Sequence, residues 1–130
     1  MKWTNLLLDS TSLKNFFCHE PLLEGITLFE INLRRDEPNC EMRFTLPEFP
    51  SNPPKKWQTS GFNRIQVTLQ LISVARIELT GWSVDNVGNM TIEKNDELIT
   101  IEFRRIDSVF ICESEFINLS KISGYQQEVK

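Results

Sequence analysis

Residues 62–71, FNRIQVTLQL, decide the fold, and they follow the proline-containing stretch Asn52-Pro53-Pro54-Lys55-Lys56-Trp57. Apolar side chains at positions 65, 67, 69 and 71 alternate with polar ones at 64, 66, 68 and 70. Because successive side chains of a strand point to opposite faces, this alternation predicts a strand with one buried and one solvated face. Such strands are typical of antiparallel sheets. The stretch contains no catalytic motif, so it indicates a scaffold rather than an activity.

Further strands are expected on the C-terminal side of this stretch. Residues 74–79 alternate again before Gly81, residues 90–92 and 98–104 flank a turn at 94–97, and residues 109–112 and 116–122 form two later apolar runs. The polar tail, residues 126–130, is expected to fray. No helical stretch of a dozen residues separates these strands, so antiparallel pairing is predicted rather than parallel βαβ units.

A short helix and a hairpin are expected on the N-terminal side. Leu13, Phe16 and Phe17 have the spacing of one helix face, Ser10, Thr11 or Ser12 can form the N-cap, and Pro21 ends the segment. Residues 26–33 and 40–46 flank a turn at 36–39, which predicts a hairpin. The alternation slips at Leu28-Phe29, as in a β-bulge or a strand covered on both faces. Prolines at 47, 50, 53 and 54 predict a connection over the surface or along a sheet edge.

Together these elements predict one domain, residues 1–130, of the α+β class. We expect an N-terminal helix packed on a mainly antiparallel β-sheet of about seven strands, in a curved or sandwich-like arrangement. With 40% hydrophobic and 25% charged residues, the composition is that of a soluble globular protein. Strand order and oligomeric state stay open.

The charge of the chain argues against nucleic-acid binding. A formal net charge of −4 supplies no positive field for phosphates, and it suits a basic partner better. The basic pairs Arg34-Arg35 and Arg104-Arg105 stand beside Asp36-Glu37, Glu102 and Asp107, so local charge balance is expected for both. The first nine residues are too short for a signal-peptide core or a membrane span, which favours a cytoplasmic protein without membrane contact.

The three cysteines favour the same compartment. Cys18, Cys40 and Cys112 are odd in number and widely spaced, without a Cys-x-x-Cys pair, so neither a disulfide framework nor a zinc site is expected. Cys40 and Cys112 fall in apolar phase within predicted strands and are interpreted as small core residues.

Two groups of residues carry side chains that can act as acids or bases. The single histidine, His19, lies near the predicted end of the first helix, where it could favour the negative end of the helix dipole; as a base it lacks an identified partner. Glu113 and Glu115 share a strand face, but solvated acidic residues are far commoner than carboxylate catalysis. We therefore predict no catalytic, cofactor-binding or metal-binding residue, and no cofactor. Trp3, Trp57 and Trp82 lie near segment boundaries, where each could cover the core or anchor a partner.

The order of several motifs resembles a known family. The residues that carry the resemblance are Trp3, Leu6-Leu7-Leu8, Leu13-Lys14-Asn15-Phe16-Phe17, Asn52-Pro53-Pro54-Lys55-Lys56-Trp57, Asn63, Gln66-Val67, Leu79, Gly81-Trp82 and Ile122-Ser123-Gly124-Tyr125. In this order and at these separations they resemble the immunity protein 50 family, over nearly the whole chain. The glycines of Gly-Trp and Ser-Gly-Tyr are expected to adopt backbone angles closed to other residues, which would turn Trp82 and Tyr125 onto the core.

The resemblance implies a small cytosolic protein that protects its producer from a cognate toxin of a bacterial polymorphic toxin system. Such a protein binds and neutralises its toxin by occluding it or locking its conformation, without chemistry of its own. If the toxin is a basic nuclease, acidic and aromatic residues in loops and at strand edges are the expected contacts. These are Asp36, Glu37, Trp57, Trp82, Asp85, Asp96, Glu97, Glu113 and Glu115. A non-catalytic ligand-binding β-rich module and, more remotely, a small hydrolase are the alternatives.

Overall fold

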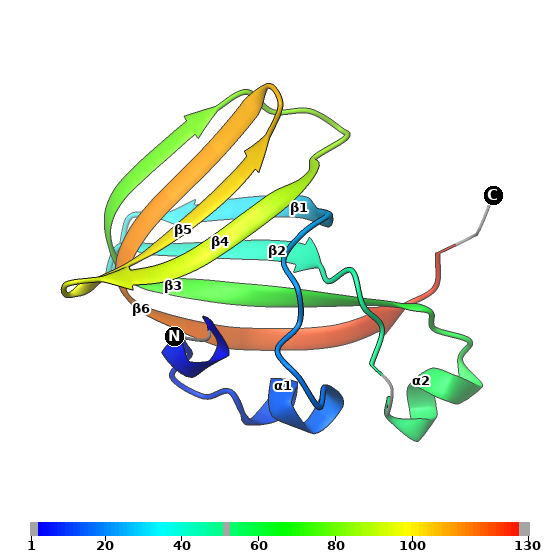
Figure 1. The fold of residues 1–130 in the computed structure, drawn as a ribbon. Coiled ribbons are helices and arrows are strands. Elements are labelled where there is room, and N and C mark those ends of the chain that lie inside the picture. Colours follow the sequence, from blue (N-terminus) through cyan, green and yellow to red (C-terminus); the bar gives the residue numbers. More distant parts are fainter. Residues whose placement is uncertain (1–2, 51–52, 128–130) are drawn as a thin grey trace.

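The computed structural model describes residues 3–50 and 53–127 and forms a closed antiparallel β-barrel (Figure 1). Six strands occur in the described residues: β1 (Ile26–Arg34), β2 (Asn39–Thr45), β3 (Arg64–Thr80), β4 (Val87–Asn95), β5 (Leu98–Arg105) and β6 (Ser108–Tyr125). Around the barrel they follow the order β1-β2-β3-β6-β5-β4. The antiparallel prediction is confirmed, whereas the sheet closes on itself instead of forming a sandwich.

Two long strands explain why the predicted number of about seven strands is wrong. β3 has 17 residues and β6 has 18, and each joins two segments that the sequence pattern separates. The breaks in alternation are irregularities inside continuous strands, because the register between β3 and β6 shifts between Thr68 and Leu69 and between Val74 and Arg76. Ser73, with φ of 58°, lies beside the second shift. Bulges bend a strand without ending it, which lets both strands pass from one side of the barrel to the other.

The barrel core comes from the inward faces of the strands. Ile65, Val67, Leu69 and Leu71 of β3 are all buried, as the alternation predicts, and Phe44 of β2 is buried beside them. On β1 the register shifts between Leu28 and Glu30, which confirms the bulge alternative for the slip at Leu28-Phe29. The bulged Phe29 meets the ring of Tyr125 edge-on at 6.3 Å between ring centroids.

Three short helices complete the described structure: η1 (Trp3–Leu6), α1 (Thr11–Phe16) and α2 (Lys55–Thr59). Figure 1 shows α1 and α2 together on the lower side of the barrel, near β6. Leu13 of α1 and Phe17 directly after it are buried in the same core as the strands, although the helix is shorter than the sequence pattern suggests. Ser10 occupies the N-cap position without a side-chain bond, and Asp9 Oδ1 instead accepts the Thr11 N–H at 3.0 Å. Helix α2 was not predicted from the sequence, because it has only five residues and the prolines before it indicate an irregular connection.

The glycine-aromatic motifs serve the fold in different ways. Gly81 has φ of +73°, as predicted, and a Cβ there would clash with the carbonyl oxygen of Asp107. Gly124 is not in the left-handed region; instead, a Cβ there would lie 2.8 Å from Phe62 Cδ2 and 2.9 Å from Trp57 Cδ2. The expectation of a special backbone angle is therefore wrong for Gly124, where close ring packing is the reason for glycine. Trp82 also differs from the prediction, because it remains half exposed instead of folding onto the core.

The cysteines and basic pairs follow the sequence predictions. All three cysteines are free thiols; Cys40 and Cys112 are buried in the core, and Cys18 is exposed. The hydrogen bond with Cys40, together with burial, raises the pKa of the Cys112 thiol. Each arginine of the two basic pairs contacts a carboxylate, in the pairs Arg34–Glu41, Arg35–Asp36, Arg104–Glu102 and Arg105–Asp107.

The barrel is unevenly closed. β1 pairs with β4 through only two residue pairs, Ile26 with Gly88 and Thr27 with Val87. Within the described part of the chain, β3 beyond Ile72 pairs with β6 alone, and residues 75–80 are exposed. The loop that follows, residues 81–86, returns to the start of β4 near this incomplete side.

Candidate functional site

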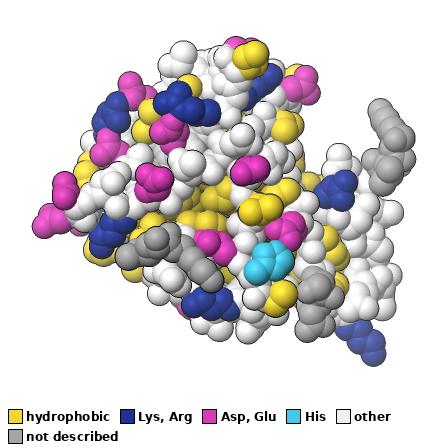
Figure 2. All heavy atoms as spheres, viewed as in Figure 1, with side chains coloured by type: hydrophobic (Ala, Val, Ile, Leu, Met, Phe, Trp, Pro, Cys, Tyr) yellow, Lys and Arg dark blue, Asp and Glu magenta, His cyan; other side chains and the backbone are white. Residues whose placement is uncertain are grey.

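The expected contact residues fall on separate parts of the surface. Asp36 and Glu37 form the β1–β2 turn, and Asp96 and Glu97 form the β4–β5 turn. Both turns lie at the left of the view in Figure 1, and acidic side chains gather at that end in Figure 2. Asp36 pairs with Arg35 at 3.3 Å, but both side chains are almost fully solvated, so this ion pair stabilises the fold little. These turns therefore offer solvated negative charge.

The β3–β4 loop presents apolar surface instead. Trp82 is 50% exposed and Val84 is 99% exposed. Local hydrogen bonds fix the loop: the Ser83 N–H donates to Asn86 Oδ1 at 3.1 Å, and the Asp85 N–H donates to Ser83 Oγ at 3.2 Å. A preformed loop that exposes an indole and a valine loses little conformational entropy when a partner covers it.

This loop is also tied to the first strand. Its Asn86 is buried, and the Asn86 carbonyl oxygen accepts the Leu28 N–H at 2.9 Å. Between the loop and β1 lies an open cleft of about 500 Å³, whose lining includes Phe29, Trp82 and Val84. We call the exposed side chains of this loop and of the first residue of β4 the β3–β4 loop surface; they are Trp82, Val84, Asp85 and Val87.

The remaining expected contacts are engaged within the fold or isolated. Trp57 is half buried, with its ring stacked on Phe16 at 5.2 Å between centroids and tilted against Phe49 at 6.3 Å. Glu113 Oε1 accepts a hydrogen bond from Arg76 Nη1 at 2.9 Å. Glu115 is exposed and makes no ion pair within the described residues. Glu113 and Glu115 thus do not converge on a shared partner.

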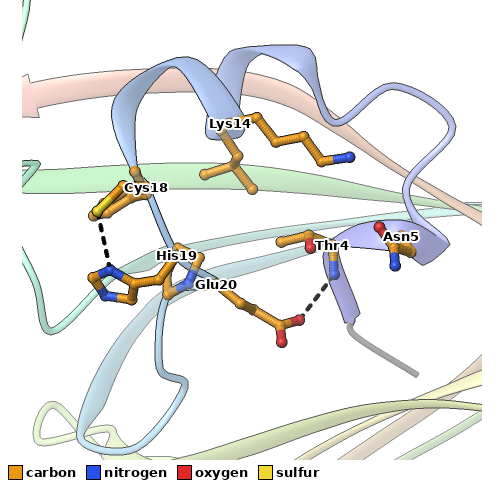
Figure 3. A pocket seen from close by; sticks show the side chains of 9 residues that line it. Thr4, Asn5, Lys14, Cys18, His19 and Glu20 are labelled. Carbon is orange, nitrogen blue, oxygen red and sulfur yellow. Dashed lines mark hydrogen bonds between the residues drawn. The ribbon is translucent and has the colours of Figure 1, made fainter.

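A chemically distinct cluster lies after helix α1, in the segment shown in Figure 3. Cys18 Sγ lies 3.6 Å from His19 Nδ1, and His19 Nε2 lies 2.8 Å from Glu48 Oε2. Helix α1 ends at Phe16, so His19 does not act at its end as predicted. Instead the imidazole bridges a thiol and a carboxylate from two chain segments that are 29 residues apart. Figure 2 shows the histidine at the molecular surface.

The cluster shifts the titration of its members. The hydrogen bond with His19 lowers the pKa of the Cys18 thiol, because it favours the thiolate. The hydrogen bonds with Cys18 and Glu48, together with the negative charge of Glu48, raise the pKa of His19 above 6.5. Cys18 and His19 line an open cleft of about 430 Å³, which also contains Lys14 and Glu20. The Glu20 side chain accepts the Thr4 N–H at 3.1 Å and so connects η1 to the cleft.

The sequence contains only part of the signal for this cluster. Cys18 precedes His19 directly, and that adjacency could have suggested the thiol as the partner of the imidazole. Glu48 lies in the proline-containing connection after β2, and no local pattern links it to His19. Its role depends on how the chain folds back beside the α1 segment.

The described residues contain neither a cluster of metal ligands nor a membrane-spanning helix. Across residues 3–50 and 53–127, no three His, Cys, Asp or Glu side chains converge as a metal site. Within the same ranges, no helix has the length and apolar character needed to cross a membrane.

Fold and surface together define a small β-barrel protein with solvated acidic turns, one exposed aromatic loop and one thiol–imidazole cluster. The chain belongs to the immunity protein 50 family, whose model matches residues 9–125. The resemblance drawn from the sequence is thereby confirmed. No curated protein and no solved structure matches the chain.

Proposed function

We propose that this protein is an immunity protein that binds a cognate bacterial polymorphic toxin and neutralises it. It acts in the cytoplasm of the producing cell, by occluding the active site of the toxin or by locking its conformation. The observation that carries this proposal is the family match over residues 9–125. Inhibition of this kind is stoichiometric and requires no turnover by the immunity protein.

The barrel suits inhibition by surface contact. Every neighbouring pair of strands is hydrogen-bonded, and the long β3–β6 pairing runs from Arg64 with Tyr125 to Thr80 with Val109. A rigid body of this kind binds without first losing the conformational entropy of its own backbone. Tight association then depends on the side chains that the body presents.

The toxin contact proposed here centres on the β3–β4 loop surface. Tryptophan is enriched among the residues that dominate binding energy, and Trp82 is the exposed tryptophan of the described structure. Exposed apolar side chains that adjoin one another mark interaction surfaces more often than scattered ones do. Asp85 adds a negative charge at the edge of this surface.

The acidic turns contribute to association in a different way. If the toxin is a basic nuclease, Asp36, Glu37, Asp96 and Glu97 attract it and raise the rate of encounter, mostly at low salt. Because these carboxylates are solvated, they add less to the lifetime of the complex than the buried apolar contacts do.

Coexpression with each candidate toxin gene from the same locus tests the function. Growth that depends on this protein supports the proposal, and failure to rescue growth against every neighbouring toxin refutes it. The contact surface is tested separately with Trp82→Ala combined with Val84→Ala. Leu22→Ala is the control, because Leu22 is also exposed, at 58%, but lies on the N-terminal segment. We expect the double variant to bind at least tenfold more weakly and the control to bind normally.

Charge reversal separates steering from anchoring. Asp36, Glu37, Asp85, Asp96, Glu97, Glu113 and Glu115 are replaced by lysine together. For a basic toxin we expect slower association that salt now accelerates instead of slowing, because the seven replacements turn the net charge of −4 positive and make the long-range force repulsive. Stopped-flow mixing is the measurement. Unchanged affinity and protection would refute the acidic contact, while protection lost only in the Trp82 variant would leave the loop contact standing.

A further inference from the structure

Cys18, His19 and Glu48 form a hydrogen-bonded array of thiol, imidazole and carboxylate. Cys18 Sγ is 3.6 Å from His19 Nδ1, and His19 Nε2 is 2.8 Å from Glu48 Oε2. Glu48 has a second anchor, since its other oxygen accepts the Leu22 N–H at 3.4 Å. With Nε2–H donated to the carboxylate, Nδ1 is free to accept the thiol proton. The array thus orients a base onto a thiol.

Access distinguishes this thiol from the other two. Cys18 is exposed and lies on the cleft of about 430 Å³, whereas Cys40 and Cys112 are buried within the barrel. The cleft has an apolar part from Leu13 and Phe17 and a polar part from Lys14 and Glu20. A small molecule can therefore reach the sulfur of Cys18 and rest against apolar side chains beside it.

We propose that Cys18 is a thiol-modification site that accepts low-molecular-weight disulfides, with His19 as its proton acceptor and Glu48 as the residue that positions His19. The thiol proton passes to His19 Nδ1. The Cys18 thiolate then attacks one sulfur of the disulfide, so that a new S–S bond to Cys18 forms as the old S–S bond breaks. The departing thiolate takes the proton from His19. Cys18 is oxidised, half of the incoming disulfide is reduced, and no further oxidant is needed.

The charges around the array act in opposing directions. Glu48 stabilises the imidazolium form of His19, and the imidazolium in turn stabilises the thiolate of Cys18. Lys14 lines the same cleft and adds positive charge, whereas the negative charge of Glu48 acts on Cys18 directly and disfavours the thiolate. Replacement of His19 should therefore raise the pKa of Cys18.

The test is the rate of reaction with an aromatic disulfide, 5,5′-dithiobis(2-nitrobenzoic acid), followed by the coloured thiolate that it releases. In the folded protein one thiol should react rapidly, and Cys18→Ser should abolish this phase while the buried thiols react only after unfolding. His19→Gln should raise the pH midpoint of the fast phase. Below both midpoints, each unit of that increase slows the reaction by roughly three- to fourfold, because the loss of thiolate is partly offset by its greater nucleophilicity.

A conservative variant and a second readout keep the test decisive. Glu48→Gln keeps an acceptor for Leu22 and should lower the pKa of His19, because it removes the negative charge that favours the imidazolium. Because the His19 side chain is 57% exposed, its replacement should leave thermal unfolding nearly unchanged near pH 9, where the imidazole is neutral. If His19→Gln does not fold, the NMR titration of His19 decides, since its pKa should fall in Cys18→Ser. Equal pH midpoints in the wild type and His19→Gln, or an unchanged His19 titration in Cys18→Ser, would overturn the proposal.

Discussion

The packing of Trp57 against Gly124 makes a quantitative prediction for Gly124→Ala. A Cβ at this position would approach Phe62 Cδ2 to 2.8 Å and Trp57 Cδ2 to 2.9 Å, well inside ordinary contact distance. The rings cannot easily retreat, because Trp57 is itself held by Phe16 and Phe49. Overpacking of this kind costs about 1–3 kcal/mol, offset by roughly 0.4–1 kcal/mol from the lower entropy of the unfolded chain.

The net expectation is a loss of about 1–2 kcal/mol in the free energy of unfolding, measured by urea titration. For a domain of this size the melting temperature should fall by roughly 3–10 °C. A melting temperature that stays the same or rises in Gly124→Ala would contradict the ring-packing argument.

A double-mutant cycle identifies the cause. If the clash is with the indole, Trp57→Leu should relieve part of the cost, so the double variant is more stable than the sum of the single effects by about 1 kcal/mol. Gly25→Ala is the control, because a Cβ at Gly25 meets nothing within 4 Å. Its combination with Trp57→Leu should be additive. Additivity for Gly124→Ala as well would refute the reasoning.

Three further predictions concern the core, the β3–β4 loop and the titration of His19. Phe44→Ala, at a position with 0% exposure, should cost about 3–5 kcal/mol in urea unfolding, whereas exposed Phe116→Ala should cost under about 1 kcal/mol. Gly81→Ala and Gly25→Ala share a positive φ, but only Gly81 adds a clash with Asp107, so Gly81→Ala should have the lower melting temperature; equal values would exclude the clash. The raised pKa of His19 stabilises the fold fully below about pH 6.5, and this contribution is lost as pH rises through the folded-state pKa. Glu48→Gln should therefore lower the melting temperature more near pH 6 than near pH 9, as differential scanning fluorimetry can measure, and an equal difference at both pH values would count against the ion pair.

The strands were predictable because their signal is local. Alternation in residues 65–71 reports which face of β3 is buried, whatever the partner strand is. The bulge at Phe29 was visible for the same reason, since a bulge shifts the phase of one strand. The strand number was not predictable in this way. A break near Ser73 has the same local appearance whether the chain turns back or bends and continues along β6.

The candidate sites were likewise predictable only where their signal is local. Acidic turns can be identified from composition, and each of them is exposed in the structure. The exposure of Trp82 and the burial of Trp57 could not be separated from sequence, because both tryptophans stand beside glycine or proline at segment boundaries. The third member of the thiol cluster, Glu48, is brought to His19 only by the folded chain.

The sequence by itself determined the antiparallel class, the buried face of residues 65–71 and the family to which the chain belongs. These properties follow from the order and type of side chains along short segments. The tertiary structure alone decided the closure of the barrel, the continuity of β3 and β6, and the contact between Glu48 and His19. Each of these depends on pairing between distant segments, and the free energy of such pairing is set by packing across the whole barrel rather than by any local pattern.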